Sequence, residues 1–154
     1  MASFRPATAG DLPRIVSLVE VCLAEFGLFV DYETADADLR DFSTVYAEPN
    51  GVFFVEIERE TIVGTGGLAT VGPSEGKIRK MYVARSHRGH GVGKRILRAL
   101  IDEAKGRRME SVVLETMDSM ETAIRMYESA GFVRQEECAV SPRCQRVYRL
   151  CLNG

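Results

Sequence analysis

The fold is decided by the sequence KIRKMYVARSHRGHGVGK, which spans residues 77–94. Residues 78–84 predict a β-strand, because Ile, Tyr and Val favour an extended backbone. Residues 85–91 form a basic loop that contains two glycines. From Val92 onward the apolar residues recur at helical spacing, which predicts an amphipathic helix that ends near Gly106. The stretch therefore predicts a strand, a glycine loop and a helix in direct succession.

A glycine loop at the start of a helix is suited to binding an anion. The first turn of a helix presents N–H groups without partners in the helix, at the positive end of the helix dipole. Gly89, Gly91 and Gly93 lack a Cβ, so a phosphate can approach the main chain closely. Arg88 adds a positive charge beside these glycines. We therefore expect the loop to bind a phosphorylated ligand, in the first place a diphosphate.

Two common phosphate-binding motifs do not fit this loop. The Walker P-loop requires a glycine five residues before a Gly-Lys pair and Ser or Thr after the lysine, but Arg88 and Arg95 stand at these places. The dinucleotide motif Gly-x-Gly-x-x-Gly has Lys94 or Ile96 at its last place. A nucleotide-binding protein of either kind is therefore disfavoured.

The loop does match the pattern Arg/Gln-x-x-Gly-x-Gly/Ala, in the sequence RGHGVG of residues 88–93. This segment resembles the acyl-CoA loop of the GNAT family of N-acetyltransferases. KMYV at residues 80–83 and LET at residues 114–116 resemble the fourth and fifth strands of the family. AIRMYESAGF at residues 123–132 resembles its second signature. The chain is identified as a member of the family on two motifs that occur in the right order with a strand between them.

The composition is that of one globular domain over residues 1–154, with 45% apolar and 27% charged residues. The net charge of −2 does not indicate a nucleic-acid surface. The four cysteines form no Cys-x-x-Cys pair and the chain has two histidines, so no metal site is expected. Without a signal peptide or a long apolar run, we expect a cytoplasmic protein with free thiols and no membrane contact.

The remaining pattern predicts further strands and helices around this centre. We expect Asp36 to cap a short helix over residues 36–46, and residues 72–76 to form a loop. Gly64, Gly66 and Gly67 suggest a bend or close packing in a strand over residues 62–71. The fold class is α/β (α+β), with a mixed, mostly antiparallel sheet flanked by helices. The resemblance implies that the fourth and fifth strands are parallel and splay apart. Expected strands cover residues 3–7, 52–57, 62–71, 78–84, 111–116, 133–140 and 146–152, and expected helices lie near residues 11–26, 36–46, 92–106 and 120–129.

The resemblance implies acetyl-CoA as the cofactor and an acetyl-CoA-dependent enzyme. In the family, the pantetheine arm pairs with the edge of the fourth strand, and a main-chain N–H there faces the thioester oxygen. Tyr127 holds the position of a family tyrosine whose phenol faces the CoA sulfur, so we expect it to protonate the departing thiolate. The cofactor-binding residues implied are Met81, Tyr82, Val83, Arg88, Gly89, His90, Gly91, Val92, Gly93 and Lys94.

The general base is not fixed by the resemblance. Many relatives carry a glutamate at the start of the fourth strand, where this chain has Lys77, which cannot act as an anionic base. Glu115 and Glu75 are the nearby alternatives, and we choose Glu115. Met120 stands where many relatives have an asparagine that contacts the cofactor arm. Covalent catalysis by a cysteine is disfavoured, because no cysteine lies in a nucleophile motif.

The acceptor is expected to be a primary amine of a small molecule or protein that attacks acetyl-CoA directly in a ternary complex. In the family, the segment between the first two helices covers the acceptor site, so Phe29, Asp31, Tyr32 and Glu33 are expected to bind substrate. Their aromatic and acidic side chains favour a cationic amine, and a solvated loop is the alternative. The resemblance also suggests a homodimer. A non-catalytic acyl-CoA-binding regulatory module is the alternative function, motivated by Lys77.

Overall fold

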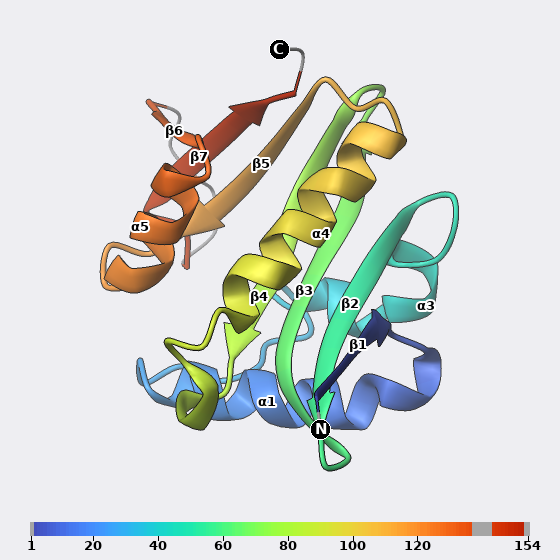
Figure 1. The fold of residues 1–154 in the computed structure, drawn as a ribbon, viewed down its shortest axis with the longest axis vertical. Helices are drawn as coiled ribbons and strands as arrows, with labels where there is room; N and C mark the ends of the chain where they lie inside the picture. The colour runs from blue at the N-terminus through green and yellow to red at the C-terminus, as the bar shows by residue number, and fades with distance from the viewer. Residues whose placement is uncertain (1, 137–142, 153–154) are drawn as a thin grey trace.

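The structure, a computed structural model, describes residues 2–136 and 143–152. Its strands form one sheet in the order β1-β2-β3-β4-β5-β7-β6, in which only β4 and β5 pair in parallel (Figure 1). The predicted mixed, mostly antiparallel sheet is therefore confirmed. The strands are β1 (Ala2–Pro6), β2 (Gly51–Glu58), β3 (Thr61–Gly72), β4 (Glu75–Val83), β5 (Ser111–Thr116), β6 (Val133–Gln135) and β7 (Arg146–Cys151). The helices are α1 (Leu12–Ala24), α2 (Ala37–Arg40), α3 (Phe42–Val45), α4 (Val92–Gly106) and α5 (Glu121–Ser129), with 3-10 turns η1 (Ala9–Asp11) and η2 (Arg85–His87).

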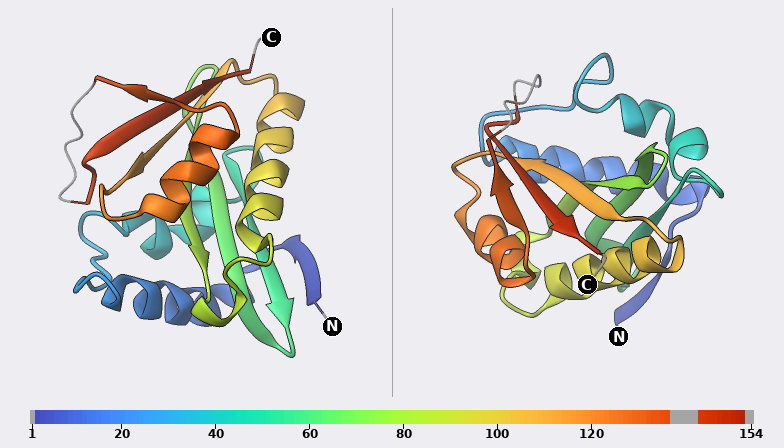
Figure 2. Two further views of the ribbon diagram at one scale, coloured as in Figure 1. Left: turned by 60° about the vertical axis from the view of Figure 1, so that its left-hand side comes forward. Right: turned by 90° about the horizontal axis from the view of Figure 1, so that it is seen from above.

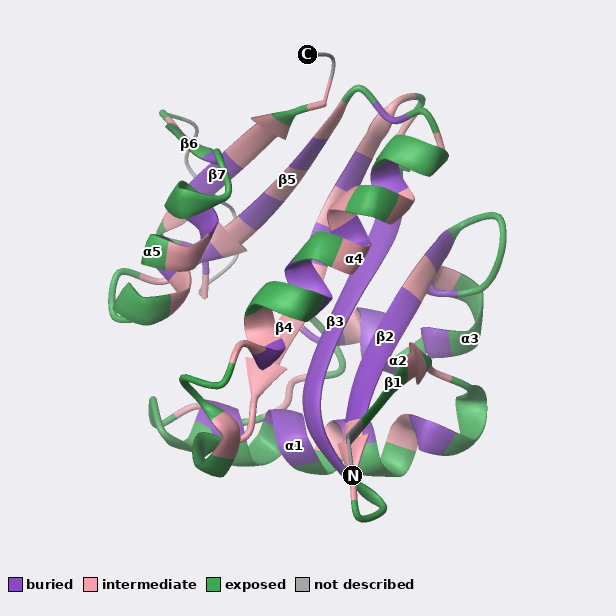
Figure 3. Cartoon of the chain, in the orientation of Figure 1, coloured by how far each residue is buried: buried purple, intermediate pink, exposed green. Residues whose placement is uncertain are grey.

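Helices cover both faces of the sheet. Helices α1, α2 and α3 lie on one face, and α4 and α5 lie on the other (Figure 2). Each face has its own apolar core, one built on α1 and one on α4. The inner sides of the helices and the central strands are buried, while the outer side of α4 is exposed (Figure 3). The apolar stripe predicted for α4 is buried at Val92, Ile96, Leu97, Leu100 and Ala104.

Glycines in β3 let α4 pack directly on the sheet. A Cβ at Gly64 would lie 2.4 Å from Val92 Cγ1, and a Cβ at Gly66 would lie 2.5 Å from Ile96 Cγ2 and 2.6 Å from Met81 Sδ. Such distances exclude any larger residue unless its neighbours move. Close packing, one of the two interpretations of these glycines, is therefore confirmed.

The loop predicted at residues 72–76 is only a turn at residues 73 and 74, and the other three residues lie in strands. Strand β3 continues to Gly72 and pairs there with Glu75, the first residue of β4. Gly76 is buried within β4, where a Cβ would lie 2.6 Å from Met109 Sδ and 2.7 Å from Leu68 Cδ1. Gly76, which was predicted to lie in the loop, is therefore needed for packing within the sheet.

Two helix boundaries also differ from prediction. The helix expected over residues 36–46 is divided into α2 and α3 at Asp41, and Asp36 makes no side-chain capping bond. Gly106 is the last residue of α4, and the left-handed residue beyond the helix is Arg108, with φ 59°. Cys22, Cys144 and Cys151 are free thiols. The predicted strand over residues 137–140 and the Cys138 thiol lie outside the described residues.

Strands β4 and β5 pair only over a short stretch and then separate. Their parallel register runs from Glu75 opposite Ser111 to Ile78 opposite Leu114, and Figure 1 shows the two strands diverging beyond it. Residues 79–83 of β4 therefore present an edge that no described strand covers on that side. The predicted splay is confirmed, and it places the candidate site. None of the described helices has the length and apolar character needed to cross a membrane.

Candidate active site

Two pockets meet where β4 and β5 separate. The first, here called the strand pocket, has a volume of about 470 Å³ and is lined by residues of β4, β5 and the segment before β7. The second, here called the loop pocket, has a volume of about 630 Å³ and lies between the glycine loop and α5. Residues that line both pockets are Met81, Tyr82, Met120 and Tyr127. These four residues mark the junction between the pockets.

The loop pocket is built on the start of α4. Gly91 is the N-cap residue of α4, and Gly89 and Gly91 have φ of 82° and 83°, a conformation that other residues rarely adopt. The unpaired N–H groups of the first turn of α4 therefore lie directly after this loop. Residues other than glycine would form the loop only with strain at positions 89 and 91. His90 is not part of the lining, and its carbonyl accepts a hydrogen bond from Arg95 Nη1 at 3.3 Å. The other loop residues predicted for the cofactor line the pocket: Arg88, Gly89, Gly91, Val92, Gly93 and Lys94.

Arg88 fixes the loop to the end of α1. Its Nη1 and Nη2 donate to the two carboxylate oxygens of Glu25, each at 2.8 Å, and its Nε donates to the Val83 carbonyl at 3.0 Å. A bidentate arginine–carboxylate pair fixes orientation as well as distance. Arg88 thus holds the conformation of the loop, and its charge is largely matched by Glu25.

Glu115, the predicted base, lies in the strand pocket. Its Oε1 is 2.7 Å from Lys77 Nζ, and the side chains are 29% and 21% exposed. Glu75, the other candidate base, lines neither pocket, pairs with Arg149 and accepts a hydrogen bond from Ser111 Oγ at 3.0 Å. Of the two carboxylates, only Glu115 is therefore placed to reach a group bound in either pocket.

Cys144 also lines the strand pocket, where it is buried. Burial, followed by the nearby Glu115 carboxylate, raises the pKa of its thiol to about 11. Because the thiolate is the nucleophilic form, this thiol is almost entirely unreactive at neutral pH. The environment of Cys144 thus disfavours this cysteine as a nucleophile.

Tyr127 lies at the junction of the two pockets and is 5% exposed. Its ring packs against Phe132 with the centroids 5.9 Å apart. Burial, followed by the nearby Tyr82, raises the pKa of Tyr127 well above the ordinary tyrosine value. The phenol therefore stays protonated at neutral pH and can donate a proton into either pocket.

A β-bulge in β4 shapes the junction. The register of β4 against β3 shifts between Arg79 and Tyr82, and Lys80 has a positive φ of 59°. The bulge is held on both sides: Thr65 Oγ1 donates to the Lys80 carbonyl at 2.7 Å, and Lys80 Nζ donates to Asp38 Oδ1 at 2.8 Å. A residue other than glycine keeps such a strained backbone conformation only where surrounding contacts hold it, as these two hydrogen bonds hold Lys80.

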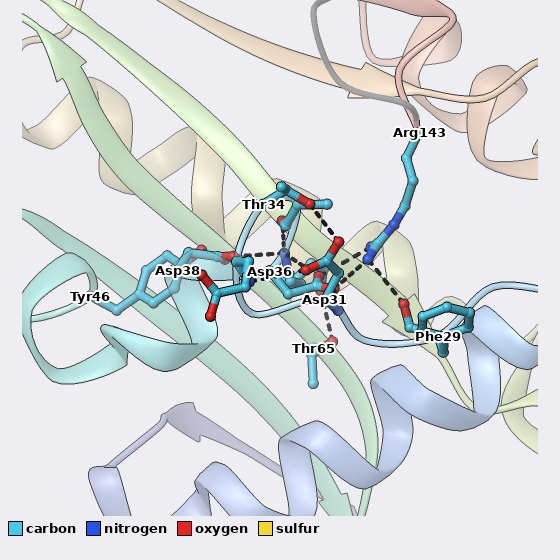
Figure 4. Close-up of polar contacts among 11 residues, drawn as sticks. Phe29, Asp31, Thr34, Asp36, Asp38, Tyr46, Thr65 and Arg143 are labelled. Atoms are coloured by element: carbon cyan, nitrogen blue, oxygen red, sulfur yellow. Dashed lines mark hydrogen bonds and ion pairs between the residues drawn. The ribbon is translucent and has the colours of Figure 1, made fainter.

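A buried ion network centred on Asp36 surrounds this bulge. Asp36 is fully buried, forms an ion pair with Lys80 at 3.2 Å, and accepts hydrogen bonds from Arg143 and from the Asp31 main chain. Figure 4 shows Arg143 reaching from the chain before β7 to Asp36 and the Phe29 carbonyl. Burial alone would raise the pKa of Asp36, but these partners together hold that pKa below the ordinary value. The network ties the α1–α2 loop, the bulge and the segment before β7 around the strand pocket.

The four predicted acceptor residues do not line either pocket. Phe29 is 79% exposed and Tyr32 is 42% exposed. The Asp31 carboxylate accepts bonds from the Glu33 N–H at 3.0 Å and from Thr34 Oγ1 at 2.7 Å, within its own loop. The lining begins just beyond them, at residues 34 and 35. Substrate contact by Phe29, Asp31, Tyr32 and Glu33 stays a prediction.

Comparison with known proteins places the chain in a family. The sequence pattern described as the acetyltransferase (GNAT) family matches residues 16–132. The chain belongs to the GNAT family. It is 32% identical over 133 residues to the Escherichia coli protein named uncharacterized N-acetyltransferase YjgM, a match that covers 83% of this chain and 80% of that one. It is 33% identical over 103 residues to the IAA acetyltransferase of Azospirillum brasilense, across 66% of each chain.

Solved structures share the fold of this GNAT acetyltransferase. A GNAT acetyltransferase of Staphylococcus aureus has a TM-score of 0.86 at 22% identity, with 99% of both chains covered. A Salmonella typhimurium protein solved with its cofactor acetyl-CoA has a TM-score of 0.73 at 18% identity, with 100% of this chain and 95% of that chain covered. The predicted family and its splayed sheet are thus confirmed, and the chain is an N-acetyltransferase.

Sequence reasoning missed several residues that line the strand pocket of this GNAT acetyltransferase. Arg79 could have been found, because strand alternation puts it on the same face of β4 as Lys77. Arg143 could not, because it meets Asp36 only through the tertiary fold, 107 residues away in sequence. Cys144 comes into the pocket together with Arg143, for the same reason.

Proposed function

We propose that acetyl-CoA binds in the loop pocket and that an amine in the strand pocket attacks the acetyl group directly, in a ternary complex. One observation carries this proposal: Tyr127 lines both pockets, beside the uncovered edge of β4. A thioester held at this junction can be reached by an amine from the strand pocket without either ligand leaving. The Salmonella typhimurium relative, whose structure holds acetyl-CoA, supports the choice of cofactor.

The residues present fit such a cofactor. The glycine loop leaves the first N–H groups of α4 accessible to a diphosphate, since Gly89 and Gly91 carry no Cβ. The edge at residues 81–83 offers main-chain groups to the amides of an extended pantetheine arm. Acetyl-CoA, when bound, supplies the thioester. A main-chain N–H of this edge then polarises the carbonyl, and loss of one such donor costs roughly 2.7–4 kcal/mol in other enzymes.

The proton transfers fall to two side chains. Tyr127 is protonated across the neutral range, because burial raises the pKa of its phenol, and we assign to it the transfer of this proton to the leaving sulfur. Glu115 accepts a proton from the acceptor amine, directly or through a water molecule, from its position in the strand pocket. Lys77 holds the Glu115 carboxylate in place.

Replacement of Glu115 by glutamine tests the base. We expect Glu115→Gln to lower kcat/KM for the amine by roughly 100-fold and to change the pH dependence of the rate, because the group that accepts the proton is lost. The measurement is the pH–rate profile from pH 6 to 10. Glu75→Gln is the matched control, since Glu75 lines neither pocket. An unchanged profile in Glu115→Gln would remove the assigned role.

Replacement of Arg88 by alanine tests the loop pocket. The partly exposed ion pair with Glu25 is worth about 1 kcal/mol. Because this pair orders the loop, we expect Arg88→Ala to weaken acetyl-CoA binding roughly fivefold. Calorimetric titration with CoA measures the effect. Arg98→Ala, at an exposed position of α4 that lines neither pocket, should leave the affinity unchanged, and an equal affinity in Arg88→Ala would contradict its role.

The function itself is tested by thiol release from acetyl-CoA. The thiol is read with a disulfide dye against a panel of amines, after the protein's own cysteines have been blanked, beside calorimetric CoA binding. Amine-dependent release is the expected result. CoA binding without release from any amine would favour the regulatory module, and failure to bind CoA would overturn the assignment of the loop pocket.

A further inference from the structure

The strand pocket has an unusual balance of charge. Of its lining residues, four carry positive charge, and Glu115 alone carries negative charge; the cations are Lys77, Arg79, Lys80 and Arg143. The acidic residues expected to attract a cationic acceptor lie outside the lining. A cation that already pairs with a protein carboxylate has little charge left for a ligand. The pairing of these four cations therefore decides what the pocket can bind.

Three of the four cations have carboxylate partners. Lys80 pairs with Asp38 at 2.8 Å and with Asp36 at 3.2 Å, and Arg143 also pairs with Asp36. Both of these aspartates are buried, behind the lining of the pocket. Lys77 is paired with Glu115 at 2.7 Å. Two buried carboxylates thus match Lys80 and Arg143, and the carboxylate of the pocket itself matches Lys77.

Arg79 is the cation that remains. Among residues 2–136 and 143–152, its guanidinium makes no hydrogen bond or ion pair, and its Nε is buried without an acceptor. An arginine side chain has five N–H donors and a permanent charge, so a buried donor without a partner is unfavourable. Arg79 is also the first residue of β4 beyond its last pair with β5, where the splay begins. An unmatched charge and an unmatched donor thus lie together on the wall of the pocket.

We infer that Arg79 binds a carboxylate of the acceptor, so that the substrate is a small amine that also carries a carboxylate, as amino acids do. This inference rests on the proposed function. The planar guanidinium suits a carboxylate through two parallel hydrogen bonds. The volume of about 470 Å³ lies in the range of small-molecule sites. The cofactor's diphosphate is assigned to the loop pocket, whose lining does not include Arg79.

Once Arg79 is paired with the carboxylate of the acceptor, each cation of the strand pocket has an anionic partner. The inferred acceptor differs from the cationic amine that residues 29–33 suggested.

Product binding tests the inference without turnover. CoA-saturated protein is titrated calorimetrically with N-acetylglycine, N-acetylleucine, N-acetylphenylalanine and N-acetylglutamate, and with the amides of the first three. We expect at least one acid to bind tenfold or more tightly than its amide. Arg79→Gln should weaken binding of that acid roughly 10- to 100-fold and leave its amide unchanged. Equal binding of acid and amide, or no binding of any acid, would overturn the inference.

Turnover of the free amines separates this inference from the proposed function. Amino acids, their amides and the corresponding decarboxylated amines are compared for KM and kcat. Acetylation of amides or simple amines, or of a peptide amino terminus, as efficiently as of any amino acid would overturn the carboxylate site and leave the acetyltransferase intact. Arg79-dependent binding of N-acetylated acids without acetylation of any amine would keep the carboxylate site and overturn the proposed function.

Two further variants keep the test interpretable. Arg79→Lys retains the charge without the planar fork and should restore part of the affinity for the acid. Arg98→Gln removes an exposed arginine that lines neither pocket and should change nothing. CoA affinity and thermal unfolding of each variant establish that it is folded. Loss of acid binding in Arg98→Gln equal to that in Arg79→Gln would show a general charge effect and contradict the inference.

Discussion

Tyr127→Phe is expected to lower kcat by roughly 100- to 10,000-fold, the range that general acid catalysis contributes in enzymes. The phenol lies at the junction of the two pockets, and phenylalanine keeps the packing against Phe132 while removing the proton. Because burial holds the pKa of Tyr127 well above the ordinary tyrosine value, the wild-type enzyme should show no loss of this acid below about pH 10. Affinity for CoA should change by less than about twofold, since the proposed cofactor contacts lie in the glycine loop and along the β4 edge.

The measurement is kcat from CoA release, with CoA affinity measured separately. Tyr148→Phe is the matched control: Tyr148 is fully buried on β7, its hydroxyl donates to Glu128, and it lines neither pocket. Unchanged turnover in Tyr127→Phe would make that residue structural. A loss of equal size in Tyr148→Phe would show that the effect comes from packing rather than from the proton.

Asp36→Asn is expected to lower the free energy of unfolding by about 3–5 kcal/mol at pH 7, the usual cost of breaking a buried ion pair from one side. The carboxylate is fully buried between Arg143 and Lys80, and its replacement removes the negative charge with which both side chains pair. The α1–α2 loop, the bulge and the segment before β7 are joined at this point, so acetyl transfer should fall as well.

The cost of Asp36→Asn should depend on pH in a defined direction. The folded pKa of Asp36 is lowered from its ordinary value of 3.8. Its contribution to stability is therefore complete above the unfolded pKa and is lost as the pH falls through the folded one. The wild type and the variant should differ by the same amount at pH 7 and pH 5, and the difference should begin to shrink only as the pH falls below about 3.8.

Urea unfolding at pH 7, 5 and 3 measures this difference. Asp118→Asn is the control, because Asp118 is 59% exposed and its pair with Arg146 should contribute less than about 1 kcal/mol. A cost below about 1 kcal/mol for Asp36→Asn at pH 7, or a cost that is larger at pH 3 than at pH 7, would contradict the assigned role of the network.

The sequence predicted those helices and strands whose apolar residues recur at a regular spacing within one segment. The stripe of α4 and the strand at residues 111–116 follow from periodicity alone, because burial of an apolar face decides both. Gly91 was predictable as well, since a left-handed residue at the start of a helix requires glycine. By contrast, Gly76 follows Gly72, Pro73 and Ser74, residues that are typical of loops, but it lies in a strand. The side chains of Leu68 and Met109 leave no space there for a Cβ.

The residues that line the loop pocket were largely predictable from the sequence, whereas most of those that line the strand pocket were not. The glycine loop is contiguous, so its chemistry is visible in sequence, whereas the strand pocket gathers side chains from distant segments. Asp36 was interpreted as a helix cap because its partners, Lys80 and Arg143, are brought to it only by the fold. The role inferred for Arg79 could not be predicted from the sequence. It depends on which carboxylates pair with the other three cations of the strand pocket, and only the fold shows those pairs.

A crystal structure of the protein with CoA bound would show whether the cofactor reaches Tyr127, where we propose that both substrates meet. We expect the diphosphate to contact the main-chain N–H groups of residues 89–94 and the pantetheine arm to follow the β4 edge. The sulfur should lie at the junction, in contact with the Tyr127 phenol. A diphosphate bound away from the glycine loop, or a sulfur outside the junction, would rule out acetyl transfer at Tyr127 as proposed.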